Sequence, residues 1–183
     1  PFPWPSPDLG WILRDAPEGP ERRYDVTFQG WVRLPVAEAA LASVRAAWPL
    51  PADRLHVQTY AEFHGYRGAA AGRHDEHHAY DAALGDETIR REAEYRHGLR
   101  HAWLSLAPES IPGVLRYRVT EALSAGRIPV VIGNGHAYPF ADRIPWGRLV
   151  VDVPGARAHE TGAILREWLR TVPPAERLAR ETE

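Results

Sequence analysis

Two arginines and a glutamate stand close together in a predicted helix that follows an apolar strand. Arg116 and Arg118 fall at the start of a helix predicted over residues 115–125. The positive end of a helix disfavours cations there by a few tenths to about 1 kcal/mol each. A bound anion reverses that effect, because backbone N–H groups and guanidinium groups both donate to it, and phosphate fits this description. Glu121 lies three residues after Arg118 on the same helix face and is placed to accept two hydrogen bonds from a ribose diol. The alternative is an ordinary surface ion pair between Arg118 and Glu121, worth about 0.3 kcal/mol.

A glycine-rich turn follows the next apolar strand. Gly133, Asn134 and Gly135 permit positive φ angles and a close approach of a ligand to the backbone. The turn lacks the third glycine of a dinucleotide fingerprint and the Gly-Lys-Ser/Thr of a phosphate-binding loop. His136 is a weak candidate for a general base, because an imidazole that titrates near neutrality is suited to deprotonating a hydroxyl. A loop histidine without a catalytic role is the alternative.

The elements that position these residues alternate along the chain. Apolar periodicity predicts strands over 24–29, 54–60, 103–107, 128–132 and 149–153, and helices over 36–48, 86–101, 115–125, 157–171 and 174–181. Residues 61–84 are expected to form a long loop with one short helix. This alternation predicts an α/β fold with a Rossmann-like, doubly wound parallel sheet. Ligands of such sheets bind beyond the carboxyl ends of the strands, so the residues after Phe28, Leu106 and Ile132 are the first to consider.

Composition limits the classes of function. The 183 residues fit one domain, and 44% apolar with 25% charged residues is typical of a globular protein. A net charge of −2 argues against a nucleic acid or an anionic membrane as a partner. No apolar run reaches the roughly 18–20 residues of a membrane span, and no signal peptide is recognised, so a cytoplasmic location is expected. The absence of cysteine excludes disulfides and thiolate chemistry.

Three motifs in a fixed order resemble the core of the exostosin family. They are Trp-Leu-Ser-Leu-Ala-Pro at 103–108, Arg-Val-Thr-Glu-Ala-Leu at 118–123 and Gly-Arg-Ile-Pro-Val-Val-Ile at 126–132. The family pattern is an apolar strand ending in proline, an Arg-x-x-Glu-Ala-Leu helix and a Gly-x-Ile-Pro-Val-Val strand. The resemblance continues through Pro139-Phe140, Ile144-Pro145-Trp146 and the strand at 149–153, about a quarter of the chain in all. Upstream, Phe28-Gln29-Gly30 resembles the Phe-x-Gly of the first strand of the same lobe.

This resemblance implies one lobe of a GT-B glycosyltransferase, an enzyme with two Rossmann-like lobes. The C-terminal lobe of such an enzyme holds a nucleotide sugar, usually a UDP-sugar, and transfers the sugar with inversion and without a metal or other cofactor. By carry-over, Glu121 binds the ribose and Arg118 binds the diphosphate. The implied donor-binding set is Gly30, Arg116, Arg118, Glu121, Gly133, Asn134, Gly135, Pro139 and Phe140. The family often has serine two residues before the arginine, where this chain has Arg116.

The resemblance also implies partners and a domain organisation. The expected partners are a nucleotide sugar, a glycan acceptor and an N-terminal lobe of the same protein, in a pathway of polysaccharide or glycan assembly. Acceptor recognition and the catalytic base are expected at least partly in that lobe. The expected organisation is a proline-rich linker or lobe junction over 1–20, a nucleotide-sugar-binding domain over 21–172 and a C-terminal helix over 173–183.

Four other interpretations compete with this one. The His-Asp-Glu-His-His run at 74–78 invites a metal site, but it matches no His-Glu-x-x-His motif and no metal is expected. Trp11, Trp31 and Trp146 are candidates for a sugar-stacking platform in a non-catalytic carbohydrate-binding module, although tryptophan is more often part of a core. A lobe that binds a nucleotide without catalysis is a related possibility. A fucosyltransferase-like enzyme using GDP-fucose also has Thr-Glu before a Pro-Val-Val strand, but lysine normally follows that glutamate, where this chain has Ala122.

Overall fold

A parallel sheet of five strands forms the centre of the molecule. The computed structural model describes residues 22–32, 34–48, 53–60 and 85–180. All strand pairs are parallel, and the order across the sheet is β2-β1-β3-β4-β5. The strands are β1 (Tyr24–Trp31), β2 (Leu55–Tyr60), β3 (Ala102–Pro108), β4 (Ile128–Gly133) and β5 (Val151–Pro154). Because the order reverses between β1 and β3, the sheet is doubly wound, and the predicted α/β, Rossmann-like class is confirmed.

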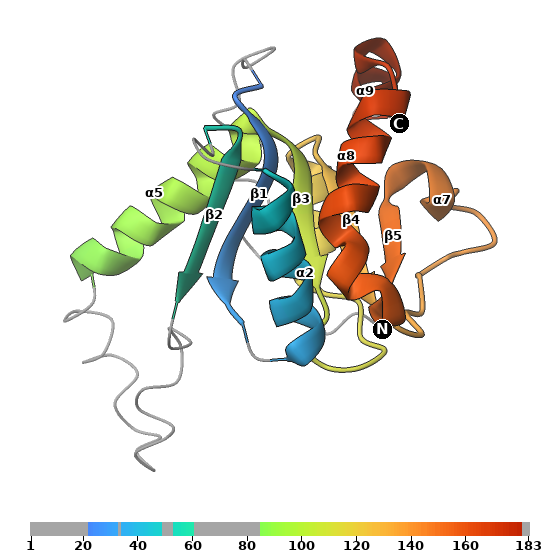
Figure 1. Ribbon diagram of the computed structural model, residues 1–183, viewed down its shortest axis with the longest axis horizontal. Coiled ribbons are helices and arrows are strands. Elements are labelled where there is room, and N and C mark those ends of the chain that lie inside the picture. Colours follow the sequence, from blue (N-terminus) through green and yellow to red (C-terminus); the bar gives the residue numbers. More distant parts are fainter. Residues whose placement is uncertain (1–21, 33, 49–52, 61–84, 181–183) are drawn as a thin grey trace.

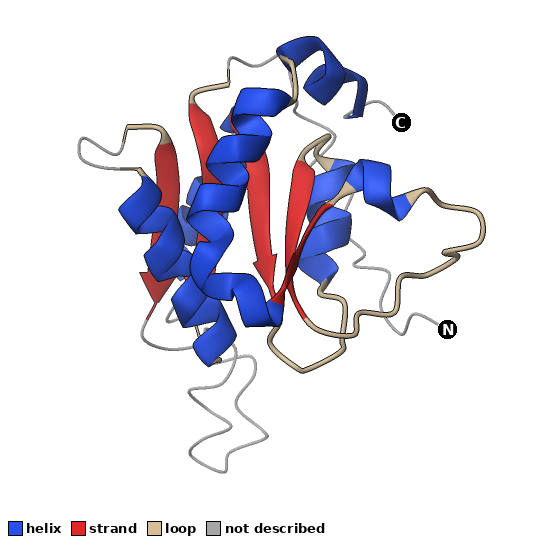
Figure 2. Ribbon diagram, turned by 45° about the vertical axis from the view of Figure 1, so that its right-hand side comes forward, coloured by secondary structure: helices blue, strands red, loops and turns tan. Residues whose placement is uncertain are grey.

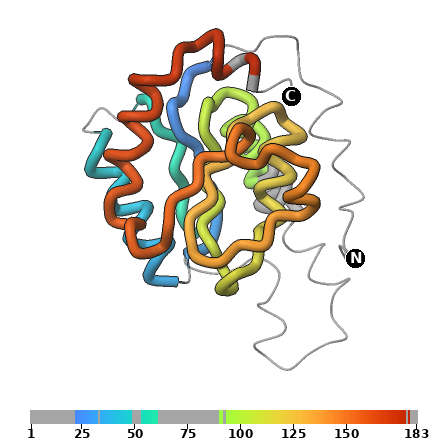
Figure 3. The backbone as a smooth tube through the Cα atoms, turned by 90° about the vertical axis from the view of Figure 1, so that its right-hand side faces the viewer, coloured from blue at the N-terminus to red at the C-terminus, as the bar shows by residue number. Residues whose placement is uncertain are grey.

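Helices cover both faces of this sheet (Figures 1 and 2). They are α2 (Pro35–Ala47), α5 (Gly85–His101), α6 (Tyr117–Ser124), α7 (Trp146–Leu149), the 3-10 helix η1 (Gly155–Glu160), α8 (Thr161–Thr171) and α9 (Pro174–Arg180). Seen nearly edge-on, α2 and α8 lie on one side of the sheet, and α5, α6 and α7 lie on the other (Figure 3). Within the described residues, no helix is long and apolar enough to cross a membrane.

The core follows from the two-residue period of the strands. On the side of α2 and α8, alternate residues of three central strands pack together; they are Val26, Phe28, Leu104, Leu106, Ile128, Val130 and Ile132. The residues between them face the other helices, so that Ala107 and Val131 pack against Val119 of α6 and Trp146 of α7. Every residue of β4 is buried, as expected for a central strand covered on both faces.

Several element boundaries differ from the sequence-based expectation, and three of these differences have a clear structural form. The predicted helix at 115–125 begins only at Tyr117, because Arg116 is extended (φ −76°, ψ 147°) and serves as its N-cap residue. The predicted strand at 149–153 begins at Val151, because a helical turn, α7, precedes it. The predicted helix at 157–171 is divided into η1 and α8. The predicted linker at 1–20 and the predicted loop at 61–84 lie outside the described residues, and α9 lies within the predicted C-terminal helix.

Three histidines pack together beside the amino end of β1. The ring centroids of His97 on α5 lie 4.6 Å from His101 and 5.9 Å from His56 on β2. The Tyr24 hydroxyl lies 3.2 Å from His97 Nε2, and the Thr27 hydroxyl lies 3.2 Å from His56 Nδ1. Burial lowers the pKa of His56 and of His97, and a neighbouring imidazole lowers each further. The folded chain therefore holds the imidazoles of His56 and His97 neutral at a pH where an unfolded chain protonates them.

We expect the free energy of unfolding to fall as the pH drops from about 6.5 to about 5.5. In this range His56 and His97 bind protons in the unfolded state but not in the folded state. The stabilisation is complete above the unfolded pKa, and each histidine held neutral removes up to about 1.4 kcal/mol per pH unit below it. Urea unfolding across this range measures the slope. His56→Gln should flatten it, and the matched change His159→Gln, at a side chain 70% exposed on η1, should leave it unchanged. An equal slope in the wild type and in His56→Gln would contradict the prediction.

Candidate functional site

The strands β1 and β3 separate at their carboxyl ends. Their pairing ends at Thr27 and Ser105. By contrast, β1 pairs with β2 as far as Trp31, and β3 pairs with β4 as far as Pro108. This separation falls where the strand order reverses, which is the place where open α/β sheets bind their ligands.

Arg118, in the first turn of α6, lies at this separation. A Cβ atom added to Gly30, near the end of β1, would lie 2.5 Å from Nη2 of Arg118. The guanidinium carbon lies 5.2 Å from the ring centroid of Phe28 and 5.4 Å from that of Tyr95, so aromatic rings support the cation. Its Nε is buried without a hydrogen-bond partner among the described residues. The structure thus places Gly30 and Arg118, two of the expected donor-binding residues, next to each other.

Glu121 bonds with Tyr95 of α5. The Tyr95 hydroxyl donates to Glu121 Oε2 over 2.6 Å. Burial raises the pKa of Glu121, while the Tyr95 hydroxyl and the charges of Arg118 and Arg116 oppose that rise. Burial also holds the pKa of Tyr95 well above its usual value, so its hydroxyl stays a donor at neutral pH. In the described part of the chain no ion pair joins Arg118 to Glu121, so the alternative of a simple surface pair is wrong.

Arg116 has a structural contact with the preceding strand. Its Nη1 donates to the carbonyl oxygen of Pro108, at the end of β3, over 3.2 Å. Burial, and then the positive charge of Arg118, lower the pKa of Arg116. No acidic residue lies in the first turn of α6. Two cations and the amino end of a helix therefore meet beside the end of β3, as the sequence predicts for an anion site.

The glycine turn after β4 holds two titratable side chains. Gly133 has a φ of +151°, and a Cβ atom there would lie 2.4 Å from Glu109 Oε2 and 2.8 Å from His136 Nε2. Gly135 has a φ of +64°, as predicted for a tight turn. The backbone N–H of Asn134 donates to Glu109 Oε2 over 3.2 Å. The side-chain Oδ1 of Asn134 accepts a hydrogen bond from the backbone N–H of Gly155 over 3.0 Å. The side chain of Asn134 therefore anchors the start of η1 to this turn.

The two remaining residues of the expected donor-binding loop, Pro139 and Phe140, differ in their surroundings. The Pro139 carbonyl accepts the indole N–H of Trp146 over 2.8 Å. Phe140 has a φ of +51° and is 63% exposed, which is unusual for a bulky residue and typical of a functional surface. Trp146 is buried and stacks on Tyr138 with ring centroids 5.1 Å apart. Trp146 is therefore part of the core and cannot contribute to an exposed sugar-stacking platform, and Trp11 lies outside the described residues.

Sequence reasoning missed two residues of this site. Glu109 is the first residue after β3 and is only 7% exposed. A polar residue at the carboxyl end of a central strand is the signal that could have found it. The bond from Tyr95 to Glu121 joins two helices, and no local spacing indicates it. The His-rich run at 74–78 lies outside the described residues, and the described ranges contain no group of three or more His, Cys, Asp or Glu residues that could hold a metal ion.

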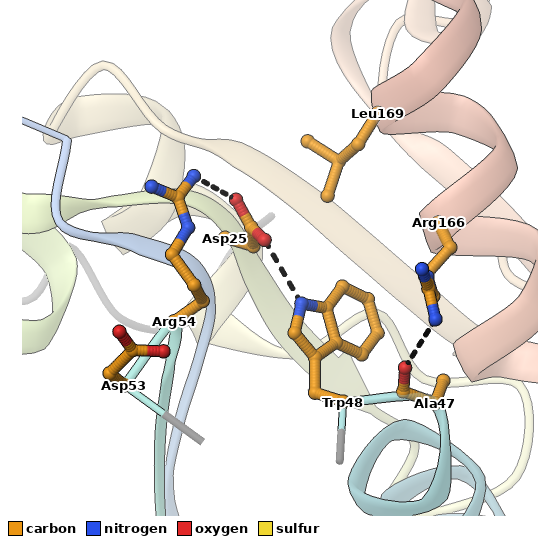
Figure 4. A pocket seen from close by; sticks show the side chains of 7 residues that line it. All are labelled: Asp25, Ala47, Trp48, Asp53, Arg54, Arg166 and Leu169. Carbon is orange, nitrogen blue, oxygen red and sulfur yellow. Dashed lines mark hydrogen bonds and ion pairs between the residues drawn. The ribbon is translucent and has the colours of Figure 1, made fainter. Parts of the chain in front are cut away.

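A surface pocket lies at the opposite, amino end of the strands, and its lining side chains hold elements of the fold together (Figure 4). Its lining residues are Asp25, Ala47, Trp48, Asp53, Arg54, Arg166 and Leu169. Asp25 accepts the indole N–H of Trp48 over 2.9 Å and a guanidinium N–H of Arg54 over 2.5 Å. Arg166 donates to the Ala47 carbonyl over 2.9 Å. These side chains join α2 and α8 to the sheet, so the candidate site stays at the carboxyl ends.

The chain matches the sequence model of a known protein family. A sequence model described as the exostosin GT47 domain matches residues 3–168, which is most of the chain. The match includes every described strand and the whole of the site at the carboxyl ends of β1, β3 and β4. The order of motifs in the sequence, the doubly wound sheet and this match agree, and the chain belongs to the exostosin GT47 family of glycosyltransferases.

Proposed function

We propose that this chain is the donor-binding lobe of a glycosyltransferase that takes a sugar from a UDP-sugar. The diphosphate lies at the separation of β1 and β3, and the ribose lies between α5 and α6. The observation that carries the proposal is the guanidinium of Arg118, which rests on aromatic rings at the switch point and has a buried Nε without a partner among the described residues.

The charge around Arg118 supports a diphosphate as the ligand. Arg116 and the amino end of α6 add positive potential, and the first turn of α6 contains no acidic residue that would offset it. An arginine presents its N–H groups in a fork that matches phosphate oxygens. In this proposal these groups neutralise the leaving diphosphate, so the reaction proceeds without a metal ion.

The chemistry that we propose is a single displacement. The oxygen of an acceptor hydroxyl forms a bond to the anomeric carbon, and the bond from that carbon to the diphosphate oxygen breaks, which inverts the anomeric centre. The electron pair of the broken bond leaves with the nucleoside diphosphate beside Arg118. A base removes the proton of the attacking hydroxyl, and His136 or a residue of a second, N-terminal lobe serves as that base.

A second lobe also fits the surface at this edge. Four large apolar side chains are at least half exposed there, in the loop before α6, at its first residue and after β4; they are Ile111, Val114, Tyr117 and Phe140. Apolar groups gathered at one edge are typical of a surface that another domain or a ligand covers. We propose that the lobe which covers them binds the acceptor, a growing polysaccharide or other glycan in the cytoplasm.

Calorimetric titration with UDP and with 2′-deoxy-UDP tests the ribose contact. We expect the wild type to bind UDP with a dissociation constant between micromolar and low millimolar, and to bind 2′-deoxy-UDP several times more weakly. Glu121→Gln should weaken UDP binding by about 3- to 10-fold, since one hydrogen bond to a charged group is replaced by a weaker one. It should also reduce the discrimination against 2′-deoxy-UDP.

The matched control is Glu167→Gln, because Glu167 is an exposed carboxylate paired with Arg170 on α8, across the sheet. It should bind both nucleotides like the wild type. A wild type that is folded and binds no nucleotide would contradict the proposed function. A preference for GDP over UDP would replace the UDP-sugar with a GDP-sugar, as in a fucosyltransferase-like enzyme.

A further inference from the structure

The buried carboxylate of Glu109 and the half-buried ring of His136 meet over Gly133, and neither belongs to the donor-binding set. Glu109 is 7% exposed, and its backbone amide continues the β3–β4 ladder by donating to the Ile132 carbonyl over 2.8 Å. Its Oε2 accepts one hydrogen bond, from the Asn134 amide. Within the described ranges Glu109 forms no ion pair. A carboxylate that is so deeply buried without a cation normally needs further hydrogen-bond donors.

The imidazole of His136 has unmet hydrogen-bonding capacity. Both Nδ1 and Nε2 are buried, and neither has a hydrogen-bond partner in the part of the chain that the structure describes. A neutral imidazole has one donor and one acceptor, and buried polar atoms in native proteins nearly always find a partner.

The glycine at 133 brings these two groups together. A Cβ atom on Gly133 would lie 2.4 Å from Glu109 Oε2, 2.6 Å from its carboxyl carbon and 2.8 Å from His136 Nε2. Both side chains therefore approach the place that a side chain at 133 would occupy. They do not pair with each other, since no ion pair between them is formed within the described residues.

We propose that Glu109 and His136 form a binding pair for the hydroxyl groups of a pyranose ring. A sugar hydroxyl donates to the carboxylate of Glu109, and the same or the neighbouring hydroxyl bonds with His136. One ligand thus supplies the missing hydrogen-bond partners of both side chains. A sugar suits the pair better than a phosphate, because an anion would be repelled by the carboxylate.

The position of the pair agrees with that of the proposed nucleotide. Glu109 follows β3 and His136 follows β4, while Arg118 lies on the other side of β3, between β1 and β3. Neighbouring strands are about 4.8 Å apart, so the pair lies beside the diphosphate at the distance of an attached sugar. This inference rests on the proposed function for the identity of the neighbouring ligand. It makes Glu109 and His136 the residues that determine sugar specificity.

Nuclear magnetic resonance of the histidine ring C–H groups in the full chain tests the pair. The signal of His136 is assigned by its absence in His136→Gln, and the exposed His159 serves as an internal control. The probes are UDP, the UDP-sugars of glucose, galactose, N-acetylglucosamine and glucuronic acid, and the methyl glycosides of the same sugars. We expect at least one sugar to shift the His136 signal, and UDP alone to shift it much less.

Glu109→Gln keeps the shape of the side chain and an acceptor for the Asn134 amide. It should weaken the binding of the effective sugar about tenfold, as expected for the loss of a charge-assisted hydrogen bond, and should leave the affinity for UDP within about twofold of the wild type. Gly133→Ala, which places a methyl group 2.4 Å from Glu109 Oε2 and 2.8 Å from His136 Nε2, should also weaken the binding of that sugar. A shift caused by UDP-sugars assigns the pair to the donor sugar, and a shift caused only by methyl glycosides assigns it to the acceptor.

The results separate this inference from the proposed function. If UDP binds and no sugar moves the His136 signal, the hydroxyl-binding pair is wrong and the nucleotide site stands. If UDP alone moves the signal as much as the UDP-sugars, the pair faces phosphate and the inference is overturned. If sugars move the signal in a chain that binds no nucleotide, the pair stands and the proposed function is wrong.

Discussion

Arg118→Ala is expected to lower the affinity for UDP by about 10- to 200-fold, which is the effect of losing about 1.5–3 kcal/mol of hydrogen bonding to a charged group. The magnitude is large because Phe28 and Tyr95 hold the guanidinium in place before any ligand binds. Little side-chain entropy is then lost on binding, and most of the interaction contributes to affinity. The buried Nε of Arg118 gains a partner only when a ligand arrives, as far as the described residues show.

Isothermal titration calorimetry with UDP, on the wild type and on Arg118→Ala, measures this loss of affinity. Arg118→Lys should restore only part of the affinity, because lysine keeps the charge and loses the planar fork of N–H donors. Arg170→Ala is the matched control, since Arg170 is an arginine that pairs with Glu167 on α8. Gly30→Ala gives a second, independent route to the same result. Its Cβ would lie 2.5 Å from Nη2, so the guanidinium must move although no cation is removed. Unchanged UDP binding in both Arg118→Ala and Gly30→Ala would exclude the switch point as the diphosphate site.

The position of these residues in the fold could be predicted from the sequence, because each of them lies in or directly after a locally encoded strand or helix. The alternation of strands and helices predicts a parallel sheet, and a parallel sheet places the residues after β1, β3 and β4 at one edge. Gly30, Arg118 and Gly133 can therefore be assigned to that edge without knowledge of any contact. The resemblance to the exostosin family rests on the same local motifs, and the family match over residues 3–168 confirms it.

Contacts between elements could not be predicted in this way. Tyr95 bonds with Glu121 across 26 positions in sequence, and the Asn134 amide bonds with Glu109 across 25. Each bond depends on the packing of one element against another, which hydrophobic periodicity does not report. The role of Trp146 shows the same limit. Its type and its place near the loop suggest a sugar platform, but Tyr138 and the Pro139 carbonyl hold its ring in the core.

Gly162→Ala is expected to lower the free energy of unfolding by about 1–3 kcal/mol, because it overpacks the contact between two helices. Gly162 is buried at the start of α8, and its amide donates to the Ser43 hydroxyl of α2 over 2.9 Å. A Cβ there would lie 2.2 Å from the Ser43 carbonyl oxygen and 2.6 Å from the Ala47 Cβ. The obstacle is mainly backbone, which cannot rotate away as a side chain can. The helices must therefore move apart, and the gain of up to about 1 kcal/mol in helix propensity is outweighed.

Urea unfolding of Gly162→Ala and of Gly147→Ala separates packing from propensity. Gly147 is an exposed glycine of α7, and a Cβ there would meet no atom within 4 Å, so alanine should leave stability equal or slightly raised. Equal stability of Gly162→Ala and the wild type would show that α2 and α8 do not pack as closely as these distances require. The contact between α2 and α8 also affects the proposed sugar-binding pair. Since η1 joins α8 to Gly155, and Gly155 bonds with Asn134, a shift of α8 should also weaken the Asn134 bond with Glu109 and the binding of sugar there.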